Sequence, residues 1–187
     1  MELIKTEIEG LFILEPKVFG DARGYFFESY SKRDFKKLTG LDVDFVQDNQ
    51  SSSSRGVLRG LHFQKGDAAQ AKLVSVVEGE VLDVAVDLRP GSPTFGRHAA
   101  VLLSGENKRR FFVPRGFAHG FSVLSDHAVF QYKCDNYYAP SEEGAVAWND
   151  PDLAIDWRLA PEEILLSAKD AAHPTMRELF PDFKGLK

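Results

Sequence analysis

The chain has 187 residues, a formal net charge of −5 and one cysteine, Cys134. This length suits one domain, residues 1–187, with a large core, while the negative charge disfavours nucleic acid or an anionic membrane as a partner. The lone cysteine excludes an intramolecular disulfide, and we find neither a signal peptide nor an apolar run of roughly 20 residues, so we expect a cytoplasmic protein.

The first 54 residues predict short strands and one helix. Residues 3–14 predict an N-terminal strand pair suited to adding to another sheet edge. Residues 18–30 carry turn signals followed by an aromatic strand. Residues 31–40, SKRDFKKLTG, predict a short helix with Ser31 as its N-cap and Gly40 just past its end. A strand then follows from Phe45, and the four serines 51–54 predict a flexible connection.

The middle of the chain alternates apolar and polar residues. Between residues 72 and 89 the alternation breaks once, at Glu78-Gly79-Glu80, which predicts two strands joined by a tight hairpin or a corner. Further strands are expected near residues 98–103, 110–113, 120–124 and 128–134. Their spacing of roughly 8 to 12 residues favours an all-β sandwich or barrel over βαβ units.

The remaining segments carry weaker signals. The charge run Lys108-Arg109-Arg110 predicts a solvated turn with no nucleotide role. From about residue 160 the tail predicts loops with short helices, one of them starting at Pro161. The sequence has no Gly-rich phosphate loop, so side chains would have to hold any bound nucleotide.

Three polar residues fall on apolar strand faces. His62 and Gln64 share one predicted face, and Lys72 lies on the apolar face of the next strand. Their spacing resembles the first cupin motif, and His119 occupies the histidine position of the second. Where metal-binding cupins have a histidine and a glutamate, this chain has Gln64 and Lys72. A weak amide ligand and a repelling cation disfavour a metal and suit an acid/base site for a developing anion.

Six stretches together resemble one cupin family, the dTDP-4-dehydrorhamnose 3,5-epimerases. They are DARGYFFE at 21–28, FVQDNQS at 45–51, GVLRGLHFQ at 56–64, PRGFAHGF at 114–121, YKCDNYY at 132–138 and SAKD at 167–170. The resemblance implies an all-β cupin-type double-stranded β-helix, or jelly roll, with short peripheral helices. It also implies cofactor-free inversion of C3 and C5 of a dTDP-linked 4-keto-6-deoxyhexose, through enolates, in dTDP-rhamnose biosynthesis.

The resemblance assigns four catalytic roles. His62 is the base and Asp170 its partner, which would fix the imidazole tautomer and stabilise the imidazolium. Lys72 would stabilise the enolate oxygen at C4, and Tyr132 would donate a proton from the opposite face. Taken alone, each has an ordinary explanation: a hydrogen-bonded core histidine, a loop aspartate, a snorkelling lysine and a packed tyrosine.

The resemblance also assigns substrate contacts. They are Arg23, Glu28, Gln47, Asn49, Arg59, His119, Tyr138, Glu143 and Lys169. Strict alternation points Arg59 away from His62, unless Gly60 permits a bulge or the two act at different depths. The family is typically a homodimer that exchanges N-terminal strands, so Arg23 and Glu28 are expected to serve the neighbour's site.

Three alternatives stay open. A single-carbon epimerase or ketoisomerase would use the same residues in a different pocket shape. A metal-dependent cupin oxygenase or isomerase would need a metal despite Gln64 and Lys72. A sugar-nucleotide binding module would leave the gathered base, acid and cation without a purpose.

Overall fold

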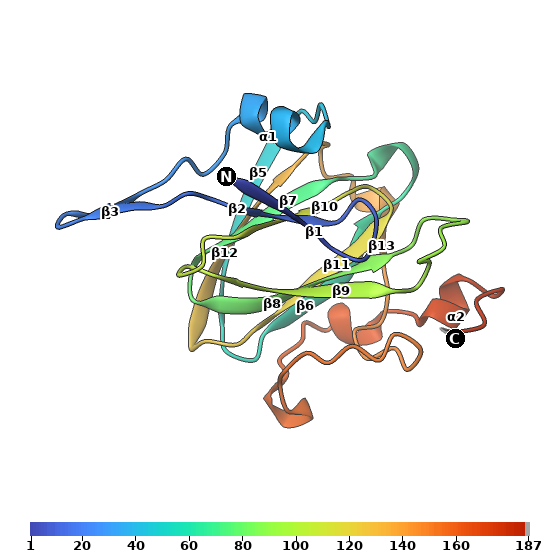
Figure 1. Cartoon of the computed structure of the whole chain (residues 1–187). Coiled ribbons are helices and arrows are strands. Elements are labelled where there is room, and N and C mark those ends of the chain that lie inside the picture. The colour runs from blue at the N-terminus through green and yellow to red at the C-terminus, as the bar shows by residue number, and fades with distance from the viewer. Residues whose placement is uncertain (186–187) are drawn as a thin grey trace.

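Two antiparallel sheets make up the body of the protein, in a computed structural model that describes residues 1–185 (Figure 1). The first sheet has the strand order β1-β2-β10-β7-β12-β5, and the second has the order β13-β6-β11-β8-β9. Buried residues of both sheets, such as Val74 and Val123, pack into one core cluster. This arrangement confirms the predicted all-β jelly roll.

The elements have the following bounds. The first sheet contains β1 (Glu2–Lys5), β2 (Phe12–Glu15), β10 (Arg110–Val113), β7 (Lys72–Glu78), β12 (His127–Cys134) and β5 (Gln47–Ser54). The second contains β13 (Glu143–Ala145), β6 (Leu58–Gln64), β11 (Phe117–Val123), β8 (Glu80–Asp87) and β9 (His98–Ser104). Outside them lie the hairpin β3 (Phe19–Asp21) and β4 (Gly24–Phe26), the helices α1 (Lys32–Thr39) and α2 (Met176–Leu179), and the 3-10 turns η1 (Gly66–Ala68), η2 (Pro140–Glu142), η3 (Pro161–Glu163) and η4 (Asp170–Ala172).

Several local predictions are confirmed. Ser31 caps α1 by accepting a hydrogen bond from the backbone N–H of Asp34, and Gly40 ends the helix in a left-handed conformation. The N-terminal strand pair forms, and β2 joins the sheet edge at β10 of the same chain. The four strands expected between residues 98 and 134 are β9 to β12.

The interruption between β7 and β8 is a corner. The two strands lie in different sheets, so the chain crosses from one sheet to the other at Gly79. Gly79 has φ of 79°, and a Cβ there would lie 2.0 Å from the carbonyl oxygen of His127. Only glycine fits this crossing.

The predicted flexible connection at residues 51–54 is wrong. These serines form the second half of β5, which pairs with β12 from Gln47 to Ser54. A run of serines is typical of turns and loops, but the complete hydrogen-bond ladder with β12 overrides this local preference. The pairing buries Ser53 and places Ser51 beside the cavity described below.

The predicted solvated turn at residues 108–110 is correct only in part. Arg109 pairs at the surface with Glu15, at 3.1 Å. Arg110 instead opens β10 and is 7% exposed, because β10 is enclosed between β2 and β7. Burial lowers the pKa of Arg110 to about 10. Its Nε has no hydrogen-bond partner within residues 1–185.

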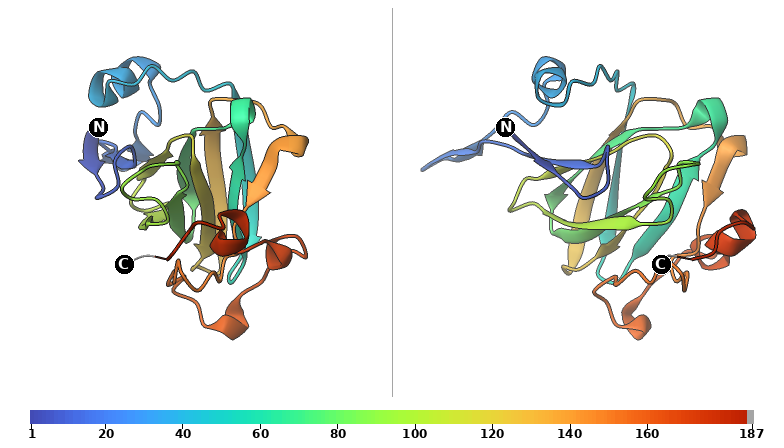
Figure 2. Two further views of the ribbon diagram at one scale, coloured as in Figure 1. Left: turned by 90° about the vertical axis from the view of Figure 1, so that its right-hand side faces the viewer. Right: turned by 45° about the vertical axis from the view of Figure 1, so that its right-hand side comes forward.

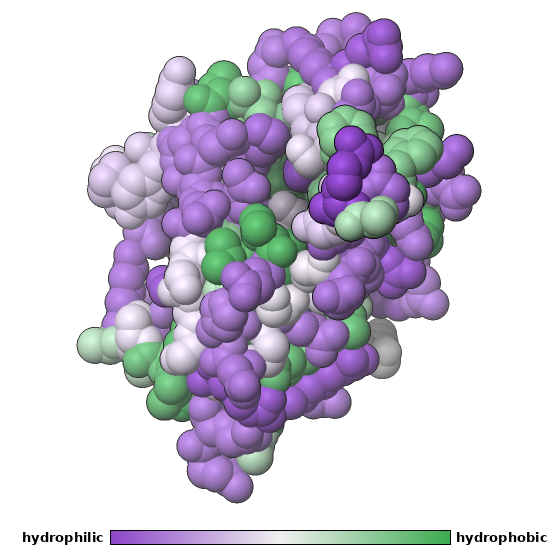
Figure 3. All heavy atoms as spheres, turned by 90° about the vertical axis from the view of Figure 1, so that its left-hand side faces the viewer, coloured by the Kyte–Doolittle hydropathy of each residue, from purple (hydrophilic) through white to green (hydrophobic). Residues whose placement is uncertain are grey.

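A two-stranded arm, residues 19–26, extends away from both sheets (Figures 1 and 2). Its strands β3 and β4 pair with each other. The expected aromatic strand through Tyr30 is shorter than predicted and ends at Phe26, which is 71% exposed. Figure 3 looks at this side of the molecule and shows apolar side chains among polar ones.

The C-terminal segment, which follows β13, covers the outer face of the second sheet (Figure 2). Leu153, Trp157 and Met176 from this segment pack against Leu82 and Val84 of β8. The same path brings η4 against β6. Across residues 1–185, the structure contains no helix with the length and apolar character needed to cross a membrane.

Candidate active site

A cavity of about 290 Å³ opens between the two sheets. It is lined by Asn49, Gln50, Ser51, Arg59, His62, Lys72, His119, Gly120, Phe121, Phe130 and Tyr132. Six of these were predicted as site residues from the sequence. Their strands, β5, β6, β7, β11 and β12, come from both sheets, so closure of the jelly roll assembles the cavity.

A bulge places Arg59 and His62 on the same cavity. The register between β6 and β11 shifts between His119 and Phe121. Gly60 has φ of 141°, and a Cβ there would lie 2.6 Å from the Cα of Gly120. This bulge is the first of the two explanations that the sequence left open for Arg59.

His62 and Asp170 form a close pair. His62 Nε2 lies 2.6 Å from Asp170 Oδ1, and Ser167 Oγ donates a hydrogen bond of 2.6 Å to Asp170 Oδ2. Burial lowers the pKa of His62, and the Asp170 charge only partly opposes this shift. His62 is therefore neutral near pH 7 and able to accept a proton.

Lys72 and Tyr132 face the same space from β7 and β12. Lys72 Nζ lies 5.8 Å from the centre of the Tyr132 ring. Burial lowers the pKa of Lys72 and raises that of Tyr132. Within the described part of the chain, no carboxylate lies within 4.0 Å of the Lys72 ammonium. Its charge is thus available to an anion in the cavity.

His119 and Gln64, the other two cupin ligand positions, have partners within the protein. His119 Nε2 lies 2.9 Å from Oδ1 and 3.0 Å from Oδ2 of Asp83. Gln64 exchanges two hydrogen bonds with the backbone of Ala139, at 3.2 and 2.8 Å. His119 still lines the cavity, but its Nε2 is already bonded, and Gln64 lies outside the cavity lining.

A hydrogen-bonded rim joins four further predicted residues. Glu143 Oε2 accepts from Tyr138 Oη at 2.7 Å and from Lys169 Nζ at 2.6 Å. The Tyr138 backbone N–H donates to Gln47 Oε1 at 3.2 Å, and Gln47 donates to Asn49 Oδ1 at 3.1 Å. Through Asn49 this rim is continuous with the cavity.

Comparisons with known proteins identify the family of the chain. A family model described as dTDP-4-dehydrorhamnose 3,5-epimerase matches residues 5–178. The chain belongs to this family. The dTDP-4-dehydrorhamnose 3,5-epimerase of Salmonella typhimurium is 57% identical over 178 residues, which cover 94% of this chain and 96% of the relative.

Solved structures of the epimerase family share the fold closely. The dTDP-4-dehydrorhamnose 3,5-epimerase of Elizabethkingia anophelis superposes with a TM-score of 0.91 at 57% identity, covering 95% of this chain and 97% of the other. The dTDP-6-deoxy-D-glucose-3,5-epimerase of Legionella pneumophila, solved with dTDP-4-keto-L-rhamnose, gives 0.90 at 55% identity, covering 93% and 92%. These matches confirm the predicted epimerase family. They also confirm the expected enzyme class, an isomerase.

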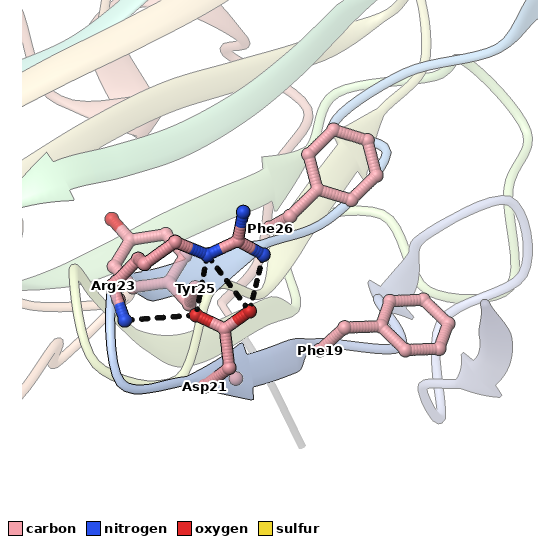
Figure 4. A pocket seen from close by; sticks show the side chains of 7 residues that line it. Phe19, Asp21, Arg23, Tyr25 and Phe26 are labelled. Carbon is pink, nitrogen blue, oxygen red and sulfur yellow. Dashed lines mark hydrogen bonds and ion pairs between the residues drawn. The ribbon is translucent and has the colours of Figure 1, made fainter.

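Two residues that the epimerase resemblance assigned to the substrate lie apart from this cavity. Arg23 is on the exposed arm, where its guanidinium bonds to Asp21 at 2.5 Å (Figure 4). Figure 4 also shows the rings of Phe19 and Phe26 directed away from this ion pair. Glu28 follows the arm and does not line the cavity either. Neither residue therefore lines the cavity of its own chain in this structure.

Two residues near the epimerase site were missed by the sequence reasoning. Asp83 lies in an apolar run of β8, and a lone carboxylate in such a run is a signal of a buried partner. His173 follows Asp170 by three residues, one turn of η4, and its Nε2 lies 3.3 Å from Asp170 Oδ1. Both signals were present, but neither residue belongs to a motif.

Proposed function

We propose that the chain converts dTDP-4-dehydro-6-deoxy-glucose to dTDP-4-dehydro-rhamnose by inverting C3 and C5, without a metal or a cofactor. The observation that carries this proposal is the His62–Asp170 pair on a cavity shared with Lys72 and Tyr132. Epimerases need a base and an acid that reach opposite faces of one carbon. Here the base lies on one sheet and the phenol on the other.

Each group has a task in the reaction. The C4 ketone acidifies the hydrogens at C3 and C5, and neutral His62 removes one of them. The Asp170 carboxylate stabilises the resulting imidazolium. The Lys72 ammonium stabilises the enolate oxygen. Because this cation is already in place, the site does not have to rearrange as the negative charge develops. Tyr132 stays protonated because burial raises its pKa, so it can return a proton from the other face.

The rim suits the nucleotide part of the substrate. Arg59 at the cavity and Lys169 at the rim provide positive charge for the diphosphate. Tyr138 is 52% exposed and offers a ring on which a base can stack. Amide groups of Gln47 and Asn49 provide polar contacts for thymine or deoxyribose.

A homodimer is part of the proposal. The arm carries Arg23 beside aromatic side chains such as Phe19, which is 55% exposed, and a second subunit would cover them. We infer that the arm reaches the partner's cavity and supplies Arg23 and Glu28 there. Light scattering and dTDP titration test this: an arm deletion is expected to give monomers with weakened dTDP binding, and a fully active monomer would contradict it.

The location of the protein is part of the proposal as well. One cysteine is in keeping with a cytoplasmic location.

Deuterium incorporation tests the reaction. Chelator-treated protein is incubated with dTDP-4-dehydro-6-deoxy-glucose in D₂O, and C3 and C5 are followed by mass and proton NMR. Exchange at both carbons supports the double epimerase, whereas exchange at one carbon indicates a single-carbon epimerase. Absence of exchange together with retained dTDP binding would indicate a binding module. Activity that depends on added metal would revive a metal-dependent cupin.

A further inference from the structure

His173 adds a third ligand-type side chain to the catalytic pair. Its Nε2 lies 3.3 Å from the same Asp170 Oδ1 that His62 Nε2 approaches to 2.6 Å. The three ligand atoms all lie within 4.8 Å of one another. The reaction proposed above requires His62 and Asp170 but has no task for His173.

The donor set suits zinc, and one of the three ligand separations already has the required length; the two imidazole ligand atoms are within 4.8 Å of each other. Zn²⁺ favours imidazole and carboxylate ligands in a tetrahedron with bonds of about 2.0–2.2 Å, which separates the ligand atoms by about 3.3–3.5 Å. The His173–Asp170 separation of 3.3 Å already has this value, and the His62–Asp170 separation of 2.6 Å must widen slightly. We propose that His62, Asp170 and His173 form an inhibitory zinc site, the inhibition resting on the proposed epimerase function.

This site differs from the metal position of the cupin motifs. Of those four positions only His62 takes part, since Gln64 bonds to Ala139 and His119 bonds to Asp83. The new site lies where η4 contacts β6, at the His62 Nε2 atom that is bonded to Asp170. Three protein ligands leave a fourth position for water, as in accessible zinc sites.

The surroundings hold two ligands in place before zinc arrives. The side chains of Asp170 and His173 are each 8% exposed, and Ser167 Oγ fixes the second oxygen of Asp170. His62, at 31% exposed, provides access. The Lys72 charge, which also acts on His62, opposes a cation. The negative charge of Asp170 partly offsets this repulsion. We therefore expect zinc to bind reversibly, so that a chelator can remove it.

Zinc would remove the base without displacing the nucleotide. Bound to Nε2, it takes the place of the proton between His62 and Asp170. That proton moves to Nδ1, and the imidazole then has no free nitrogen to accept a substrate proton. Neither Tyr138 nor Lys169 of the rim is a zinc ligand. Turnover is therefore expected to fall while dTDP binding persists.

Direct zinc binding is the deciding measurement. Metal-free protein competes with a chromophoric chelator for ZnCl₂, using the wild type, His173→Gln and the matched control His127→Gln on the surface of β12. We expect one Zn²⁺ per wild-type chain, an unchanged control, and at least about 100-fold weaker binding for His173→Gln. Equal binding by all three proteins, or no stoichiometric binding by the wild type, would overturn the site.

Two further measurements guard this test. His62→Asn removes a zinc ligand that lies on β6, whereas His173 lies in the C-terminal segment. This variant must also weaken zinc binding, and it tests the site even if His173→Gln fails to fold. Deuterium exchange by the wild type should stop as zinc fills the site and recover with EDTA. Exchange that survives full zinc occupancy would disprove inhibition. A protein without exchange even in EDTA would refute the epimerase proposal, while the binding data would still decide the zinc site.

Discussion

Two histidine–aspartate pairs occupy facing positions in the second sheet but have different surroundings. His119 on β11 lies opposite His62 on β6 in the strand register. The His119 and Asp83 side chains are 7% and 0% exposed, and both come from adjacent strands. The His62 side chain is 31% exposed, and its partner Asp170 comes from a turn in the C-terminal segment.

We infer from this comparison that the surroundings of each pair decide its role. A pair enclosed within a sheet satisfies two buried polar groups and thereby stabilises the fold. A pair completed from outside the sheet leaves the imidazole on a cavity with the Lys72 cation. Burial keeps the imidazole of His62 neutral. The carboxylate of Asp170 is positioned to stabilise the imidazolium that forms when His62 accepts a proton. The first pair is expected to govern stability and the second to govern turnover.

The largest expected effect is on turnover. His62→Asn keeps a polar side chain of similar shape but cannot accept a proton, so kcat should fall by about 10²–10⁴-fold. Initial rates and deuterium exchange measure this, and the melting temperature should stay close to that of the wild type. The surface variant His127→Asn is the control. A His62→Asn protein with a tenth of the wild-type rate would break the comparison.

The matching change in the other pair should act on stability. His119→Asn leaves the fully buried Asp83 carboxylate without its partner, which should lower the free energy of unfolding by about 3–5 kcal/mol. Urea unfolding measures this loss, and the double variant with Asp83→Asn should recover part of it. A loss comparable to that of a surface substitution would show that Asp83 finds another partner.

Removing the cavity cation should slow the reaction somewhat less. Lys72→Met keeps the length and packing of the side chain but leaves the enolate oxygen without its charge. The rate should fall by about 10²–10³-fold, as for the loss of one oxyanion donor. Nucleotide affinity, measured by dTDP titration, should change little because the rim is intact. A large loss of dTDP affinity would instead make Lys72 a binding residue.

The smallest effect is a shift in pH dependence. Because burial lowers the pKa of His62, the acid limb of kcat/KM should lie below the ordinary histidine value of about 6.5. The unfolded chain then binds the proton more readily, so the stability contribution of His62 falls as pH drops below that value. The Lys72 charge also lowers the pKa of His62, so NMR titration of Lys72→Met should show a higher value. An unchanged pKa would show that the two groups do not interact.

The sequence by itself determined the parts of the structure that depend on neighbouring residues. Local backbone preferences and side-chain periodicity account for the caps of α1 at Ser31 and Gly40, the break between two strands at Gly79 and the alternation of most strands. Six sequence stretches also identified the family, and the strand alternation placed His62 and Lys72 on interior faces. These features need no knowledge of which strands pair.

Only the tertiary structure decided which distant groups meet. Asp170 is 108 residues from His62, and no local signal shows that η4 packs on β6. The serines of β5 form a strand because their hydrogen-bond ladder with β12 outweighs local preference. Arg110 is buried because β10 pairs with its neighbouring strands. The pairing of β8 with β11 likewise assigned Asp83 to His119. Proximity and burial are properties of the closed jelly roll, and they set the charge and role of each group.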